Sequence, residues 1–92
     1  NKSIPESFFF FFFYPNPFNP TTTIKYGIPG QSNVKISIYN INGKRIKTLT
    51  NKSYETGYYE VKWDASDFAS GIYFYKINAD DITKVKKCVL MK

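Results

Sequence analysis

Few side chains in this sequence could perform acid–base or metal chemistry. The chain has 92 residues with no histidine and a single cysteine, Cys88. Tetrahedral zinc sites, a Cys-His nucleophile pair and a Ser-His-Asp triad need histidine or several cysteines, so the sequence excludes them. The carboxylates left for general acid–base catalysis or calcium binding are Glu55, Glu60, Asp64, Asp67, Asp80 and Asp81.

These carboxylates are better explained as turn residues. Asp64 and Asp67 flank Ser66 in a turn-rich stretch that lacks the spaced oxygen ligands of an EF-hand loop. Asp80 and Asp81 are predicted to form a hairpin turn. Glycine-rich phosphate-binding motifs are absent. We therefore predict no catalytic residue, no metal and no cofactor, and keep weak calcium binding and a small enzyme built on Asp64 or Asp67 as minor alternatives.

Charge and composition indicate a folded domain whose surplus of lysine is compatible with an anionic surface. The net charge is +6, and 42% of the residues are hydrophobic, which is too apolar for a disordered chain. The lysines are dispersed from Lys25 to Lys92 without an RNA-binding signature, so we predict no nucleic-acid partner. Their charge instead favours encounter with a surface such as lipopolysaccharide. No apolar run is long enough to predict a membrane-spanning segment, and the first residues lack the pattern of a signal peptide. Because the sequence starts at Asn1 and not at Met, we expect it to be a piece of a longer protein.

Short β-type runs separated by turn residues predict an all-β sandwich. In the clearest run, Val34, Ile36 and Ile38 alternate with polar residues and should face the core. The dipeptide Asn42-Gly43 then offers positive φ angles for a tight hairpin. The expected strands are Thr22–Ile28, Val34–Tyr39, Lys44–Leu49, Tyr58–Trp63, Ile72–Asn78 and Thr83–Met91, with a proline-rich edge piece near Tyr14–Phe18 as a seventh.

A Gly-x-Tyr sequence at the start of one strand predicts a tyrosine corner, a feature of immunoglobulin-like sandwiches. Gly71 permits the bend, and the Tyr73 hydroxyl should bond back to the upstream backbone. Tyr75 then points inward where antibody domains carry a cysteine. Because no second cysteine exists, aromatic packing must replace the disulfide, and Trp63 and Val61 should face the same core.

The run Phe8–Phe13 fits no position in a small sandwich, because successive strand residues point to opposite faces. We expect that the run packs on an adjoining domain, or that these phenylalanines are not the residues of the natural protein. A patch that binds a membrane or a partner is the lesser alternative.

The sequence resembles the C-terminal sorting domains of the type IX secretion system of Bacteroidetes. The resemblance begins with the family motif Tyr14, Pro15, Asn16, Pro17, Phe18, Asn19 and Pro20. It continues in order through 34–43, 57–64, 69–76 and 86–92. Flagellar hook-capping immunoglobulin-like modules are similar in their Pro-Asn-Pro start and Gly-x-Tyr turn, but the ordered set that ends at Lys92 is specific to the sorting domains.

The resemblance implies an immunoglobulin-like antiparallel β-sandwich of about seven short strands that acts as a non-enzymatic secretion signal. Residues 1–13 would be a linker to an absent upstream cargo domain, and residues 14–92 the sorting domain. The implied partners are the type IX translocon and shuttle proteins, which recognise the folded domain, and a surface sortase that cleaves it. The implied route runs through the periplasm to the outer-membrane surface or the extracellular medium.

The resemblance also supplies candidate recognition residues, namely Gly71, Tyr73, Lys86, Lys87, Val89, Leu90 and Lys92. We expect the first two to build the corner and the terminal lysines to be contacted. Deletion of residues 87–92 should then abolish export while most of the core stays folded. Family members have mixed apolar and polar residues where this chain has Phe9–Phe13, as if a placeholder had replaced them. They more often have Met or another apolar residue at the position of Cys88, which we expect to behave as a small buried hydrophobe.

One alternative from a different class stays open. An immunoglobulin-like spacer, or a carbohydrate-binding accessory module of a secreted hydrolase, would use the same fold. In that case Tyr58, Tyr39 or Tyr54 would be exposed and would stack on sugar rings.

Overall fold

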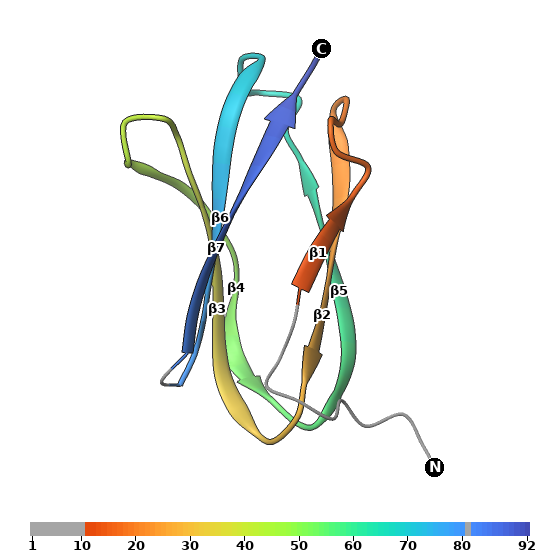
Figure 1. The fold of residues 1–92 in the computed structure, drawn as a ribbon, viewed down its shortest axis with the longest axis vertical. Helices are drawn as coiled ribbons and strands as arrows, with labels where there is room; N and C mark the ends of the chain where they lie inside the picture. The colour runs from red at the N-terminus through yellow and green to blue at the C-terminus, as the bar shows by residue number, and fades with distance from the viewer. Residues whose placement is uncertain (1–10, 81) are drawn as a thin grey trace.

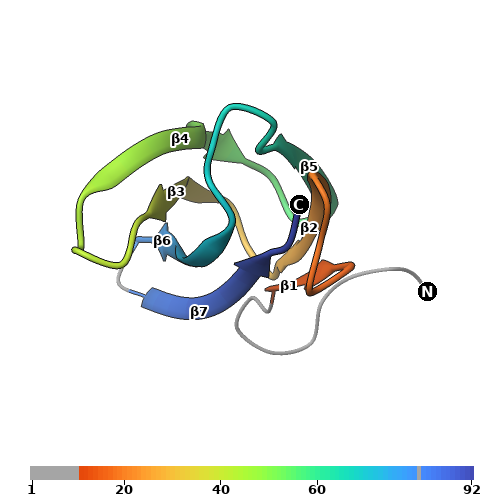
Figure 2. The same ribbon diagram turned by 90° about the horizontal axis from the view of Figure 1, so that it is seen from above.

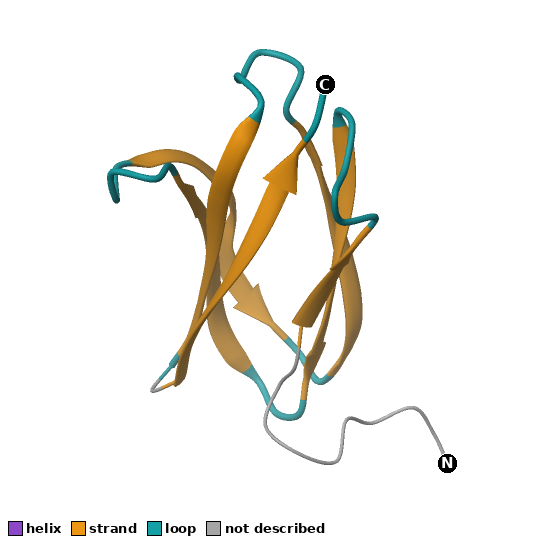
Figure 3. Cartoon of the chain, turned by 45° about the horizontal axis from the view of Figure 1, so that its top comes forward, coloured by secondary structure: helices purple, strands orange, loops and turns teal. Residues whose placement is uncertain are grey.

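The computed structural model describes residues 11–80 and 82–92, which form strands and no helix (Figure 3). The strands are β1 (Phe11–Tyr14), β2 (Thr21–Ile28), β3 (Ser32–Tyr39), β4 (Arg45–Tyr54), β5 (Gly57–Asp64), β6 (Gly71–Ala79) and β7 (Ile82–Leu90). All strand pairs within the sheets are antiparallel. The predicted all-β antiparallel sandwich is confirmed.

Two sheets face each other across one core. One has the strand order β1-β2-β5 and the other β4-β3-β6-β7 (Figures 1 and 2). The second and fifth strands therefore share one sheet, and the third, sixth and seventh share the other, as in immunoglobulin-like sandwiches. The fourth strand joins the larger sheet, where it pairs with β3.

Alternating apolar residues build the core. The β3 residues Val34, Ile36 and Ile38 are at most 1% exposed, as their alternation predicted. The β5 residue Trp63 is fully buried and Val61 is partly buried against it, also as predicted. The remaining buried apolar residues, which come from both sheets and their loops, are Phe18, Ile24, Tyr26, Ile28, Tyr54, Ala65, Tyr73, Tyr75, Ile77, Ala79, Cys88 and Leu90.

The β3–β4 hairpin differs from its predicted geometry at one residue. Gly43 has a positive φ of 82°, but Asn42 does not. The Gly43 N–H donates to the Asn40 carbonyl and the Asn40 N–H donates to the Lys44 carbonyl. This is a three-residue loop, a turn followed by one left-handed glycine, so only one position needs the conformation that glycine favours. The Asn40 side chain also accepts hydrogen bonds from the N–H groups of Asn42 and Lys44.

Strand β4 continues five residues beyond the predicted end at Leu49. Residues Thr50 to Tyr54 pair with Ile36 back to Ser32, and register shifts in the β3–β4 ladder accommodate the pairing. The predicted boundary was wrong because the polar run 50–53 lacks an apolar pattern, although its backbone still completes the ladder.

The N-terminal edge is built in two pieces. Strand β1 pairs with β2, so the edge strand begins earlier than the predicted piece near Tyr14. Phe18 then forms an isolated parallel bridge to Leu90 of β7, in the other sheet. The proline-rich segment thus runs from one sheet to the other. Of the phenylalanine run, residues 8–10 lie outside the described residues, as does Asp81 of the predicted turn at Asp80.

An aromatic cluster joins the two sheets near the end where the C-terminus lies. The Trp63 ring centroid lies 5.5 Å from that of Tyr73 and 6.1 Å from that of Tyr75, both on β6. It also lies 5.4 Å from Phe18 and 5.7 Å from Phe68. Tilted and edge-on contacts at these distances are favourable beyond the area they bury. Aromatic packing therefore occupies the place of the missing disulfide, as the sequence predicted.

A second aromatic cluster joins the sheets toward the opposite end. Tyr26 and Tyr59 of the smaller sheet pack on Tyr54 of β4, with ring centroids 5.6 and 4.7 Å from it. The Tyr26 hydroxyl donates to the Tyr54 hydroxyl at 2.9 Å, so the buried polar tips are paired. Burial, the hydrogen bond that Tyr26 donates to Tyr54 and the nearby tyrosines together raise the pKa of Tyr26.

Replacing Trp63 should remove the largest contact between the sheets. Trp63→Ala is expected to lower the free energy of unfolding by about 3–5 kcal/mol, because the deleted ring leaves a cavity among four aromatic neighbours. Ile41→Ala at the hairpin tip, where the side chain is 69% exposed, should change it by less than about 0.5 kcal/mol. Urea unfolding measures both. If both variants lowered the free energy of unfolding equally, the result would contradict the role of Trp63 as the largest contact between the sheets.

Candidate functional site

The tyrosine corner forms as predicted. The Tyr73 hydroxyl donates to the carbonyl oxygen of Ala69, four residues upstream, at 2.6 Å. The Tyr73 side chain is 8% exposed and packs edge-on against Phe68 and Trp63. The ring therefore fastens the 65–70 loop onto the core. This geometry supports the expectation that Tyr73 builds the corner.

Gly71 begins β6 with a φ of +151°, a conformation that L side chains rarely adopt. A Cβ placed there would meet nothing within 4 Å, so the backbone angle and not space favours glycine. Gly71 pairs in register with Leu90. The first two recognition candidates are thus structural supports beside the end of β7.

The last strand separates buried from exposed candidates. Leu90 is 1% exposed and Cys88 fully buried, whereas Val89 is half-buried on the other face of the sheet. Lys86 and Lys87 are exposed. Lys86 lies opposite Tyr75 and Lys87 opposite Phe74 in the β6–β7 ladder, so the two lysines leave opposite faces of the sheet. The predicted residues therefore do not form one side-chain patch.

The family motif at residues 14–20 contacts the end of β7 directly. The Phe18 N–H donates to the Val89 carbonyl at 3.0 Å, and the Met91 N–H donates to the Phe18 carbonyl at 2.9 Å. The Val89 N–H donates to the Asn16 side-chain oxygen at 3.0 Å. Two motifs more than seventy residues apart thus share one set of backbone hydrogen bonds.

The rest of the proline-rich motif is fastened to β2 and to the 65–70 loop. The Thr22 hydroxyl donates to the Pro15 carbonyl at 3.0 Å, and the Ala65 N–H donates to the Pro20 carbonyl at 2.9 Å. The Phe18 ring is buried against Trp63. Proline carbonyls accept these bonds while proline nitrogens donate none, which suits a crossing segment at the edge of both sheets.

Lys92 is held by the 65–70 loop. Its backbone N–H donates to the Ser70 hydroxyl at 3.0 Å, and its Nζ donates to the Ser66 carbonyl at 2.5 Å. The Ser66 hydroxyl and backbone N–H both donate to the Asp64 carboxylate. These two hydrogen bonds, with a smaller contribution from the charge of Lys92, lower the pKa of Asp64. The carboxylate is thereby explained as a loop-fixing group.

Three segments distant in the sequence therefore meet at one end of the sandwich. We call this surface the terminal junction and define it as residues 14–20, 64–71 and 88–92. In Figure 1 it lies at the top, where the chain passes between the sheets beside the C-terminus. Exposed side chains around it include Tyr14, 71% exposed, and Met91, 58% exposed. The sequence predicted each segment, but not that they contact one another.

The geometry changes what deletion of residues 87–92 would do. The deletion removes two core residues, Cys88 and Leu90, and both backbone partners of Phe18. Fully burying one such side chain contributes about 1.5–3 kcal/mol, a large share of a small domain's stability. We therefore correct the expectation that most of the core would stay folded, and test recognition with substitutions of exposed side chains.

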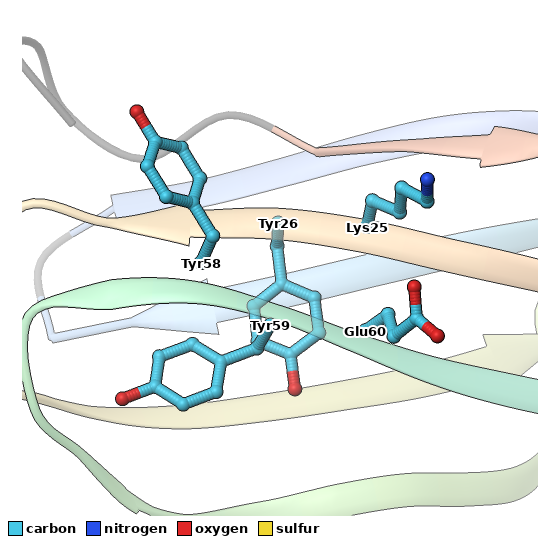
Figure 4. Close-up of a pocket in the computed structure, with 5 residues that line it drawn as sticks. All are labelled: Lys25, Tyr26, Tyr58, Tyr59 and Glu60. Atoms are coloured by element: carbon cyan, nitrogen blue, oxygen red, sulfur yellow. The ribbon is translucent and has the colours of Figure 1, made fainter. Parts of the chain in front are cut away.

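Of the tyrosines considered for sugar stacking, only Tyr58 keeps a largely exposed ring, at 53%. Tyr54 is 8% exposed with its hydroxyl bonded to Thr50 and Tyr26, so this candidate was wrong. Tyr58 lines an open pocket of about 390 Å³ together with Tyr26, Tyr59, Lys25 and Glu60. Figure 4 shows it pointing to the opposite side of the strands from Tyr26 and Tyr59.

Within residues 11–80 and 82–92, no three histidine, cysteine or carboxylate side chains gather as a metal-binding group. Cys88 is buried, as expected, and its Sγ lies 3.5 Å from the Tyr73 carbonyl. Burial raises the pKa of the Cys88 thiol to about 11. No helix of the length and apolarity needed to cross a bilayer occurs in the described part of the chain.

Comparison with known proteins gives one informative result. A family model described as "Secretion system C-terminal sorting domain" matches residues 12–91, a span that includes all seven motif residues at 14–20 and, apart from Lys92, the three segments of the terminal junction. A search of curated proteins found no match.

Removing one hydroxyl should test the tyrosine corner. Tyr73→Phe keeps the ring but leaves the Ala69 carbonyl without its donor, so the free energy of unfolding should fall by about 1 kcal/mol. Tyr14→Phe, at a 71% exposed position, is the matched control and should stay within about 0.5 kcal/mol of the parent. Chemical denaturation measures both, and an unchanged Tyr73→Phe variant would contradict a structural role for the hydroxyl.

The buried thiol should make stability fall at alkaline pH. The folded-state pKa is raised to about 11, so the unfolded state loses its thiol proton first as pH rises from the ordinary range of cysteine. Unfolding is therefore favoured progressively up to about pH 11. Cys88→Ala should show a shallower fall between about pH 8 and pH 10 in urea titrations. The two proteins differ only at residue 88, so parallel curves would contradict the prediction.

Proposed function

This chain belongs to the family of secretion system C-terminal sorting domains, and from that premise we propose that the terminal junction is the surface through which its signal is read. Domains of this family are sorting signals of proteins that the type IX secretion system exports across the outer membrane, to the cell surface or the medium. Such a domain is itself non-catalytic and is recognised by the type IX machinery.

The observation that carries the proposal is the pairing of the two family motifs. Asn16 and Phe18 hold the backbone of Val89 and Met91, and the 65–70 loop holds Lys92. A short basic and apolar peptide that was free in solution would adopt many conformations, and binding it would cost conformational entropy. Here the fold has already fixed it, so a partner meets one preorganised surface.

Exposed groups of different chemistry lie around this fixed backbone. Met91 and Tyr14 present apolar surface, and Lys92 adds a positive charge beside them. Lys87 adds a second charge two residues before Val89. Apolar contacts of this kind give affinity at the centre of an interface, while charges at its rim give specificity and speed of encounter. Gly71 and Tyr73 contribute by holding the loop in place.

We also propose which partners bind this surface and what the remaining residues do. Translocon components and shuttle proteins would bind the terminal junction of the folded domain. Residues 1–13 would connect residues 14–92 to an upstream cargo domain, and a surface sortase would cleave the domain from the cargo. The exposed lysines of the domain would also contact anionic lipopolysaccharide during transit.

Secretion of a reporter tests the proposal without disturbing the core. Residues 1–92 are fused behind a periplasm-directed fluorescent protein in a type IX-competent bacterium and in a translocon-null strain. The double variant Lys87→Gln/Lys92→Gln should lower extracellular fluorescence at least about tenfold, the effect of losing roughly 1.4 kcal/mol of recognition. Its thermal unfolding midpoint, measured on purified protein, should stay close to that of the parent because both side chains are exposed.

A matched variant controls for net charge. Lys25→Gln/Lys84→Gln removes two exposed lysines that lie outside the junction, one in the middle of β2 and one near the start of β7, at the end of that strand away from the junction. It should secrete like the parent. Equal export of both variants would contradict reading at the terminal junction, and export of the parent from the translocon-null strain would contradict a type IX signal.

A further inference from the structure

Charge is segregated between the two sheets. The strands of the four-stranded sheet carry eight of the chain's 13 Lys and Arg residues and no Asp or Glu. The described strands of the three-stranded sheet carry two lysines and two carboxylates, which cancel. The domain is therefore not evenly basic. One sheet holds an uncompensated positive charge, and the opposite sheet is neutral.

The outer face of the four-stranded sheet combines this charge with aromatic residues in one cross-strand row. Tyr39 of β3 pairs in register with Phe74 of β6, so the two side chains are neighbours at the centre of the row. Arg45 of β4 pairs with Tyr39, and Lys87 of β7 pairs with Phe74. The row thus reads cation, aromatic, aromatic, cation across the four strands.

The rows on either side add one more cation and further apolar residues. One neighbouring row contains Lys76 and Val85, and the Lys76 Nζ lies 5.8 Å from the centroid of the Tyr39 ring, a cation–π distance. The row on the other side contains Ile72 and Val89. Ile72 is 38% exposed and Val85 57% exposed. We call this surface, built on Tyr39, Ile72, Phe74, Lys76 and Val85 with Arg45 at its edge, the basic-apolar face.

No described strand covers the basic-apolar face. In Figures 1 and 2 the side of β6 and β7 that points away from β2 and β5 is open, and the β3–β4 hairpin projects beyond it. The described carboxylates lie elsewhere: Glu60 and Asp64 belong to β5, and the others stand in turns. An exposed apolar surface with cations and no anion suits a partner that offers negative charge next to apolar material.

From these observations we propose that the basic-apolar face docks on an anionic lipid surface. A membrane presents phosphate groups in a plane with acyl chains directly beneath them, so one partner satisfies both halves of the pattern. The amine and guanidinium groups of Lys76 and Arg45 reach phosphates while their methylene stems lie along the aromatic pair. The side chains of Ile72 and Val85 enter the layer of acyl chains beneath the phosphates.

Docking on lipid goes beyond recognition of the terminal junction. The basic-apolar face belongs to the sheet formed by β4, β3, β6 and β7, whereas the junction lies at one end of the sandwich. Lys87 pairs with Phe74 and directly precedes the junction, and Val89 belongs to the junction and pairs with Ile72, so the lipid test leaves these two residues unchanged. A failure of lipid docking therefore leaves the secretion result unaffected, and the two proposals stand or fall separately.

Vesicle co-sedimentation of the full 92-residue chain provides the test. Vesicles of phosphatidylcholine with about a third phosphatidylglycerol should bind the parent chain, and vesicles of phosphatidylcholine alone should bind it at least about tenfold more weakly. Arg45→Glu/Lys76→Glu should lower binding to the anionic vesicles at least about tenfold. Lys25→Glu/Lys62→Glu, with the same change in net charge on the opposite sheet, should lower it less than about threefold. All variants keep residues 1–13, so any contribution of the phenylalanine run is common to them.

A third variant separates a lipid from an acidic polypeptide. Val85→Ser at its 57% exposed position should weaken vesicle binding while binding to polyglutamate, measured in parallel, stays unchanged. Three results would overturn the proposal. The two charge-reversal pairs could lower vesicle binding equally, the parent could bind equally well to vesicles with and without phosphatidylglycerol, or the parent could bind polyglutamate but not vesicles. Far-ultraviolet circular dichroism of each variant confirms that the strands are intact.

Discussion

Trp63 joins the two sheets of this domain, because its indole contacts rings from the larger sheet, the proline-rich segment and the 65–70 loop. A sandwich of this size without a disulfide depends on such contacts to fix one sheet against the other. The terminal junction inherits its geometry from the cluster. Phe18 packs on Trp63 and also bonds the end of β7, and Tyr73 packs on Trp63 and also bonds the loop that holds Lys92.

Local pattern explains which parts of this structure the sequence could predict. The alternation in β3, the glycine of the hairpin and the Gly-x-Tyr corner each depend on residues within a few positions of one another, and each was confirmed. The length of β4 was missed because its polar end pairs through the backbone alone. The contact between Asn16 and Val89 was missed because a parallel pairing across most of the chain leaves no local sequence signal.

The two proposed surfaces belong to different parts of the fold. The end of the sandwich carries fixed backbone and a few exposed side chains, which suits recognition by another protein. The outer face of β3, β6 and β7 carries cations and apolar groups side by side in the same rows, which suits an extended surface. Both arise from strand β7, whose alternate residues face the core and solvent, so a single strand contributes to stability and to two surfaces.

The bridge between Phe18 and Leu90 also has a kinetic meaning. Contacts between residues so far apart in sequence form late, because the chain must lose the entropy of a long loop before they are gained. The strands of each hairpin can pair earlier, but the parallel bridge needs both sheets in place. We therefore expect the junction to form only in the finished domain and not in partly folded chains. A partner that binds this surface would therefore bind the folded domain and not a partly folded one.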